Sequence, residues 1–151
     1  MVDASQSPQD VPNACPFCGA RSVVDFSRAE EDMPCPSCAR HLWFVRQPMD
    51  DVAVLIFLPG LMSGAESLPR VDEVVSAVAG SSRVAVDVSR LRVISSVFLG
   101  MLVSLQRRLK AAQAALRVFG VTPGHREVFR ATNLDTVLSL HEDQQSALAS
   151  F

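Results

Sequence analysis

Four cysteines in the first quarter of the chain carry the clearest chemistry in the sequence. They form two pairs, with two residues inside each pair and sixteen between the pairs: Cys15, Cys18, Cys35 and Cys38. A two-residue spacing lets one tight turn direct both sulfurs at a common point, and Pro16 and Pro36 pre-set the backbone of each turn. Gly19 permits the positive φ that follows the first turn. Two such turns predict a tetrahedral site of four thiolates, the geometry that structural Zn²⁺ prefers.

Other roles for these thiols are two disulfides, a redox-active pair, or an iron site, because tetrahedral sulfur ligation suits iron as well as zinc. Residues 1–13 contain no basic or apolar run of a signal peptide, which disfavours disulfides. Residues 14–46 are too few to close an apolar core unaided, so we expect the metal to fold them. This segment resembles the zinc ribbon family. We expect one structural zinc per chain, with no open coordination position for catalysis.

Beyond the cysteines, strand patterns alternate with helix patterns. Apolar runs and alternating valines predict strands over residues 52–58, 83–88 and 116–119. Apolar residues at helical spacing predict helices over 68–78, from Ser95 onward, and over 123–132. Asn133 stands where a left-handed helix cap belongs, and a short segment at 137–140 and a final helix from Glu142 complete the chain. This alternation predicts an α/β layer domain.

The chain is therefore expected to have three parts. Residues 1–13 have little to bury and are predicted to be a disordered tail. Residues 14–46 form the small β zinc ribbon, residues 47–51 form a connector with turn chemistry, and residues 52–151 form the α/β domain.

Composition narrows the function classes. The 151 residues are 48% apolar and carry a net charge of −2. No stretch reaches the ~20 apolar residues of a membrane helix, so we expect no membrane insertion, and the missing signal peptide predicts a cytoplasmic protein. Three histidines and no tyrosine leave few acid–base groups, and no histidine stands in a catalytic pattern, so we expect no enzyme. Four arginines balance four acidic residues within 14–46, which argues against binding of nucleic acid.

The α/β segment resembles the STAS family, which includes bacterial anti-sigma factor antagonists and the cytoplasmic tails of sulfate transporters. The resemblance is carried by Val84-Ala85-Val86-Asp87-Val88-Ser89, Val93-Ile94-Ser95-Ser96 and Leu99-Gly100-Met101-Leu102. It continues through Leu116-Arg117-Val118-Phe119, residues 123–129 and Asn133-Leu134-Asp135. The resemblance implies a mixed sheet with packed helices. It also implies a non-enzymatic signalling protein that binds an anti-sigma factor or a related kinase-like ATPase.

In that family, a loop reading Asp-Ser-Ser-Gly precedes a helix, and its second serine accepts phosphate from a partner kinase. In the register fixed by Asp87 and Gly100, Ser95 replaces the aspartate and Ser96 keeps the first serine, while Val97 takes the acceptor position and Phe98 the glycine position. Because valine has no hydroxyl, either the switch is lost or Ser96 has taken it over, and we favour loss.

The same helix start is the expected partner-binding surface, formed by Ser95, Ser96, Val97 and Met101. Helical spacing places Phe98 on the core face, and we expect Val97 and Met101 to form an apolar docking patch. Two other functions stay open. One is a nucleic-acid-associated adaptor that uses the ribbon, and the other is a soluble component of a lipid or anion transport complex.

Overall fold

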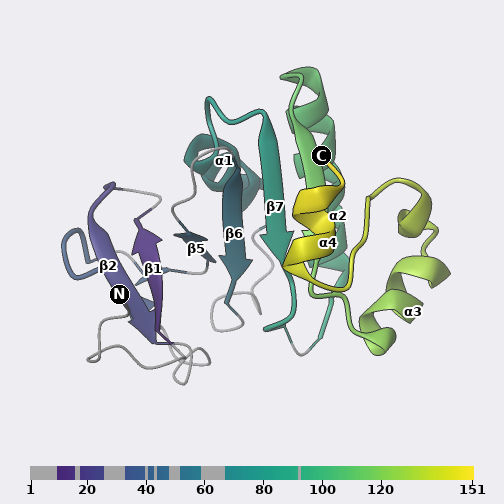
Figure 1. The fold of residues 1–151 in the computed structure, drawn as a ribbon, viewed down its shortest axis with the longest axis horizontal. Helices are drawn as coiled ribbons and strands as arrows, with labels where there is room; N and C mark the ends of the chain where they lie inside the picture. Colours follow the sequence, from purple (N-terminus) through teal and green to yellow (C-terminus); the bar gives the residue numbers. More distant parts are fainter. Residues whose placement is uncertain are drawn as a thin grey trace.

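The computed structural model describes residues 10–15, 18–25, 33–39, 41–42, 44–47, 52–58, 67–91 and 93–151. Within these ranges the strands are β1 (Asp10–Ala14), β2 (Arg21–Asp25), β3 (Met33–Pro34), β4 (His41–Leu42), β5 (Phe44–Gln47), β6 (Ala53–Phe57), β7 (Arg83–Asp87) and β8 (Ala115–Phe119). The helices are α1 (Ser67–Ala77), α2 (Ser96–Ala111), α3 (Pro123–Ala131), the 3₁₀ turn η3 (Leu134–Thr136) and α4 (Gln144–Ala149). Figure 1 shows the hairpin of β1 and β2 beside the larger sheet.

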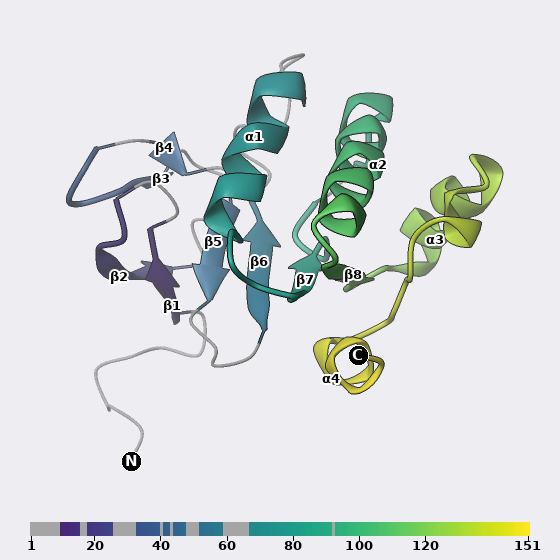
Figure 2. The same ribbon diagram turned by 90° about the horizontal axis from the view of Figure 1, so that it is seen from above.

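Strands β5, β6, β7 and β8 form one mixed sheet in that order. β6, β7 and β8 run parallel, and β5 pairs antiparallel with β6 at the edge. Helices α1 and α2 connect the parallel strands and cover one face of the sheet, whereas α4 lies on the other face (Figure 2). The mixed α/β fold expected from the sequence is confirmed, because parallel neighbours need such helical crossovers.

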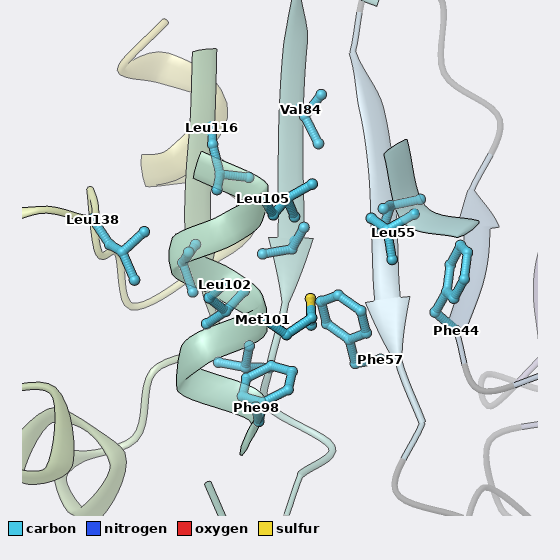
Figure 3. Close-up of a cluster of buried hydrophobic side chains, with 14 of the residues drawn as sticks. Phe44, Leu55, Phe57, Val84, Phe98, Met101, Leu102, Leu105, Leu116 and Leu138 are labelled. Carbon is cyan, nitrogen blue, oxygen red and sulfur yellow. The ribbon is translucent and has the colours of Figure 1, made fainter. Parts of the chain in front are cut away.

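The main core lies between the sheet and helices α1 and α2. α2 contributes a buried stripe at helical spacing: Phe98, Met101, Leu102, Leu105 and Leu109. These side chains pack against the strands, as the labelled side chains of Figure 3 show. Leu55 and Phe57 of β6 point toward the helices, while Val54, the residue before Leu55, lies on the opposite face, as the alternation of a strand requires.

That opposite face is covered by the C-terminal segment. Val54, Ala85 and Phe119 pack with Ala147 of α4. Before α4, Leu140 forms a parallel bridge to Val118, so the chain extends the β8 edge and then turns under the sheet. Asp143 caps α4 by accepting a hydrogen bond from the backbone N–H of Ser146 at 2.8 Å.

The cysteine-containing segment forms two antiparallel hairpins, β1 with β2 and β3 with β4. Two expected boundaries shift. Residues 10–13, predicted to lie in a disordered tail, belong to β1, because the turn at Cys15 sets them opposite β2. Residues 44–46, predicted to end the ribbon, belong to β5, because fully buried Phe44 and Val45 complete the edge of the larger sheet. Residues 1–9 and the acidic segment 30–32 lie outside the described residues.

Candidate functional site

Equivalent backbone hydrogen bonds close the two cysteine turns. In the first, the N–H of Gly19 donates to the carbonyl of Cys15 at 2.9 Å, and Gly19 has a φ of 78°. In the second, the N–H of Ala39 donates to the carbonyl of Cys35 at 2.9 Å, and Ala39 has a φ of 62°. The positive φ expected at Gly19 is confirmed. Its counterpart at Ala39 was not foreseen, because alanine gives no signal for a conformation that costs it about 1 kcal/mol.

These turns bring the four sulfurs together. All four Sγ atoms lie within 4.8 Å of one another. The Sγ atoms of Cys15 and Cys38 are 3.9 Å apart, and those of Cys18 and Cys35 are 3.7 Å apart. A tetrahedron built on Zn–S bonds of about 2.3 Å has edges of about 3.8 Å, so the spacing fits a four-thiolate metal centre. None of the four cysteines forms a disulfide.

Local electrostatics favour the thiolate form at Cys35. The pKa of its thiol is lowered from 9.0 to about 6, first because the backbone N–H of Cys38 donates to its sulfur. A second donor is the backbone N–H of Ser37, at 3.4 Å. Cys15 and Cys35 are buried, Cys38 is half-buried and Cys18 is exposed. The arrangement can hold a metal ion, and four protein ligands leave that ion no open position.

The second candidate site is the N-terminus of α2. Ser95 caps the helix, and its Oγ accepts a hydrogen bond from the backbone N–H of Phe98 at 3.1 Å. The backbone carbonyl of Ser95 accepts a hydrogen bond from the N–H of Leu99 at 3.0 Å. Ser96 is exposed, and Val97 is 36% exposed. Together Ser95, Ser96 and Val97 form what we call the α2 N-terminal surface.

Met101 does not belong to that surface. Its side chain is only 2% exposed, so the expectation that it forms an exposed docking patch with Val97 is wrong. Positions 98, 101, 102 and 105 follow the three- and four-residue steps of one helix face, and Met101 therefore joins the stripe of Phe98 and Leu102. Figure 3 shows its sulfur beside the ring of Phe57.

Sequence reasoning missed Val93, which is 79% exposed in the loop before α2. A signal for it was present, because this valine lies outside both the strand alternation of β7 and the helical spacing of α2. Val93 adds apolar surface four residues before Val97 in the sequence.

The loop that leads to α2 is anchored at the carboxyl ends of β7 and β8. Asp87 Oδ1 accepts a hydrogen bond from the backbone N–H of Ser89 at 2.8 Å, and the N–H of Val88 donates to the carbonyl of Phe119 at 3.0 Å. Gly120 has a φ of 75° and lies so close that a Cβ there would be 2.5 Å from Asp87 Oδ1. Glycine is required here both for its conformation and for this close approach.

Several polar side chains interact near the C-terminus, where the chain covers the second face of the sheet. The Nε2 of His141 lies 3.0 Å from the Oγ of Ser139. Burial lowers the pKa of His141, and the charges of Arg117 and Arg126 lower it further, against an opposing effect of Asp143. Arg117 also donates from Nε to the Oγ of Ser150 at 2.8 Å.

The fold and the cysteine cluster define the class of protein: a mixed α/β sheet covered by helices, preceded by two hairpins that gather four thiols. The chain belongs to the STAS family, since the family described as "Mlab, STAS domain" matches residues 45–141. The match begins within β5, in agreement with the place of that strand in the larger sheet.

Solved structures show the same fold. An anti-sigma-factor antagonist (STAS) domain protein from Planctomyces limnophilus is 23% identical, with a TM-score of 0.60 over 71% of this chain and 96% of that one. An anti-sigma factor antagonist from Mycobacterium paratuberculosis is 22% identical, with a TM-score of 0.57 over 71% and 91% of the two chains. RsbS from Moorella thermoacetica is 16% identical, with a TM-score of 0.61 over 71% and 92%.

No curated protein sequence matches this chain. Among the residues that the structure describes, no helix has the length and apolar character needed to cross a membrane.

Proposed function

We propose that this protein is a non-enzymatic regulatory protein that acts by binding a protein partner, in the manner of an anti-sigma factor antagonist. The expected partner is an anti-sigma factor or a related kinase-like ATPase, and the contact surface is formed by Ser95, Ser96 and Val97. The STAS fold supports the regulatory binding role. The observation that carries the proposal is an exposed valine, Val97, at the position where the resemblance places the phosphate acceptor.

Binding is proposed to be constitutive. Valine has no hydroxyl group, so this position accepts no phosphate. Ser96 keeps an exposed hydroxyl in the first turn of α2, where the free N–H groups and the helix dipole tolerate an anion, and it is therefore the remaining candidate for phosphorylation. The apolar surface of Val93 and Val97 instead favours burial against a partner, because both side chains lose contact with water on docking.

The test is an affinity pull-down from the native host with the wild type and the Val97→Asp variant. A carboxylate buried without a partner costs more than about 1.4 kcal/mol, so an interactor with a histidine-kinase-like ATPase fold should bind the variant at least about tenfold more weakly. Val137→Asp is the matched control. Val137 is also an exposed valine, at 49%, but it follows η3 and does not belong to the α2 N-terminal surface. If the Val97→Asp variant captured the interactor as well as the wild type and Val137→Asp do, the proposed surface would be contradicted.

The phosphorylation question has its own test. After treatment with the partner kinase, we expect no phosphate on the chain and unchanged binding. Phosphate mapped to Ser96, together with loss of binding that Ser96→Ala prevents, would show that Ser96 has taken over the switch.

We propose zinc as the occupant of the four-cysteine centre, with a structural role. The sulfur spacing and the closed ligand set support a structural metal, and the reduced thiols suit the cytoplasm, where we place the protein. Elemental analysis of protein purified without added metal should find about one zinc per chain. Iron in place of zinc would identify a rubredoxin-like centre, and a metal-free, fully folded ribbon would contradict a metal centre altogether.

A second candidate function is a soluble subunit of a lipid or anion transport complex. The missing phosphate acceptor favours it, because a subunit that stays docked in an assembly needs no switch. A membrane ATPase that copurifies with the wild type and is lost with Val97→Asp would favour this candidate over the antagonist role.

A further inference from the structure

The four-cysteine centre is joined directly to the edge of the larger sheet. Cys38 precedes Phe44, the first residue of β5, by six residues, and a single residue separates β4 from β5. Strand β1, which ends next to Cys15, also contacts β5. β5 is therefore held from two directions by the hairpins that supply the cysteines.

Buried aromatic rings continue from β5 to the start of α2. The ring centroids of Phe44 and Phe57 are 6.2 Å apart with the planes tilted by 56°. The ring of Phe57 meets that of Phe98 edge-on, at 5.4 Å and 85°. All three rings are at most 2% exposed, and Figure 3 shows Phe57 between β5 and α2. Such edge-on and tilted contacts are geometrically specific, so a shift of one ring disturbs the next.

Phe98 is the buried residue that directly follows the α2 N-terminal surface. It follows Val97, and its backbone N–H is the group that the Oγ of Ser95 caps. The position of the Phe98 ring therefore affects the first turn of α2, where Ser96 and Val97 are presented. A disturbance at Phe44 has a physical route to this turn that does not pass through solvent.

We propose that metal occupancy of the four-cysteine centre controls the order of the α2 N-terminal surface through Phe44, Phe57 and Phe98. This inference rests on the proposed docking function and supplies its regulation: the metal centre does what phosphorylation cannot do at Val97. The two-state element is the pair of hairpins together with β5, because a four-thiolate segment of this size is ordered with its metal and loosened without it. With zinc bound, β5 stays paired with β6 and the Phe98 ring is fixed. Without zinc, β5 frays and the first turn of α2 loses order.

The test is hydrogen–deuterium exchange of the full chain, loaded with Zn²⁺ or stripped with a chelator. Removal of zinc should speed exchange in β5 and also at the amides of 98–102, the latter by about 2- to 30-fold, the range of measured coupling between linked sites. Amides of 115–131, in β8 and α3, should change less than twofold. Faster exchange confined to the hairpins, or lost protection throughout 115–131, would overturn the inference.

Variants locate the route. Phe57→Leu removes the central ring, and we expect zinc removal then to leave exchange at 98–102 nearly unchanged. Phe129→Leu is the matched control, because Phe129 is fully buried in the same core but belongs to α3, and it should preserve the response. Phe44→Leu tests the other end of the route if Phe57→Leu does not fold. A response that survives in both route variants would overturn the inference.

The same experiments separate this inference from the proposed function. If Val97→Asp leaves the partner bound while zinc removal still speeds exchange at 98–102, the docking surface is wrong and the coupling stands. If Val97→Asp abolishes binding while the exchange rate at 98–102 does not change on removal of zinc, the docking surface stands and the coupling is wrong.

Discussion

Gly120 offers a sharp test of how firmly the loop before α2 is held. In Gly120→Ala, the new Cβ would lie 2.5 Å from Asp87 Oδ1, 2.7 Å from Ser89 Cβ and 2.9 Å from the backbone N of Ser89. The Asp87 carboxylate could rotate away at the loss of its hydrogen bond, but the Cβ and backbone N of Ser89 are fixed by the turn. The substitution must displace the turn at Ser89 or push β8 away from β7.

The expected cost has three contributions: the backbone conformation, a lost hydrogen bond and steric overlap. Alanine at a φ of 75° costs about 1–2 kcal/mol, partly offset by about 0.4–1 kcal/mol from the stiffer unfolded chain. Loss of the hydrogen bond from Ser89 to Asp87 adds about 1 kcal/mol, and the steric overlap adds about 1–3 kcal/mol. We therefore expect Gly120→Ala to reduce the free energy of unfolding by roughly 3–5 kcal/mol.

Gly80→Ala isolates the conformational part. Gly80 has a φ of 86°, but a Cβ there would meet nothing within 4 Å, so we expect a cost of only about 1 kcal/mol. Urea unfolding followed by circular dichroism compares the two variants. A difference of about 2–4 kcal/mol should separate their midpoints by about 1–2 M at the usual slope for a chain of this size. Equal midpoints would refute the claim that the ends of β7 and β8 are rigidly packed against each other.

Two further predictions concern stability. Met101→Ala should destabilise the fold by about 2–5 kcal/mol in the same urea assay because it opens a cavity beside Phe57, whereas Val97→Ala should cost less than about 1 kcal/mol; similar losses would contradict the burial of Met101. His141 has a folded-state pKa below its ordinary 6.5, so the unfolded chain binds the proton first and stability should fall as the pH drops below about 6.5. In thermal unfolding between pH 7.5 and 5.5, His141→Gln should flatten this dependence, and an unchanged slope would assign it to other groups.

Much of the larger sheet could be predicted from sequence because each element repeats its apolar residues at a distinct period. The run from Val52 to Leu58 is apolar throughout since β6 is buried on both faces, and Ser95 precedes the stripe that starts at Phe98. The predicted left-handed residue, Asn133, has a φ of 58°. The cysteine cluster could be predicted for a different reason. Two short turns of fixed length restrict where the four sulfurs can lie.

The sequence was less informative where a residue satisfies two patterns at once. Met101 lies outside the narrow seam of Phe98, Leu102, Leu105 and Leu109, but a helix that faces a sheet buries a wider stripe, and this stripe includes Met101. Phe44 and Val45 follow the cysteines so closely that the sequence alone places them in the ribbon. Only the pairing of β5 with β6 shows that they complete the larger sheet.

One local difference in sequence bears both on the proposed loss of the switch and on the packing of α2. Relative to the loop that the resemblance provides, Val97 takes the place of the acceptor serine and Phe98 that of glycine. A glycine has no side chain that could anchor the first turn of a helix in the core, whereas Phe98 is 2% exposed and held edge-on against Phe57. A surface anchored by a buried ring responds to what moves that ring. In this chain the rings of Phe57 and Phe44 connect Phe98 to β5, so the proposed control of the surface lies at the strand next to the four cysteines instead of at a serine hydroxyl group.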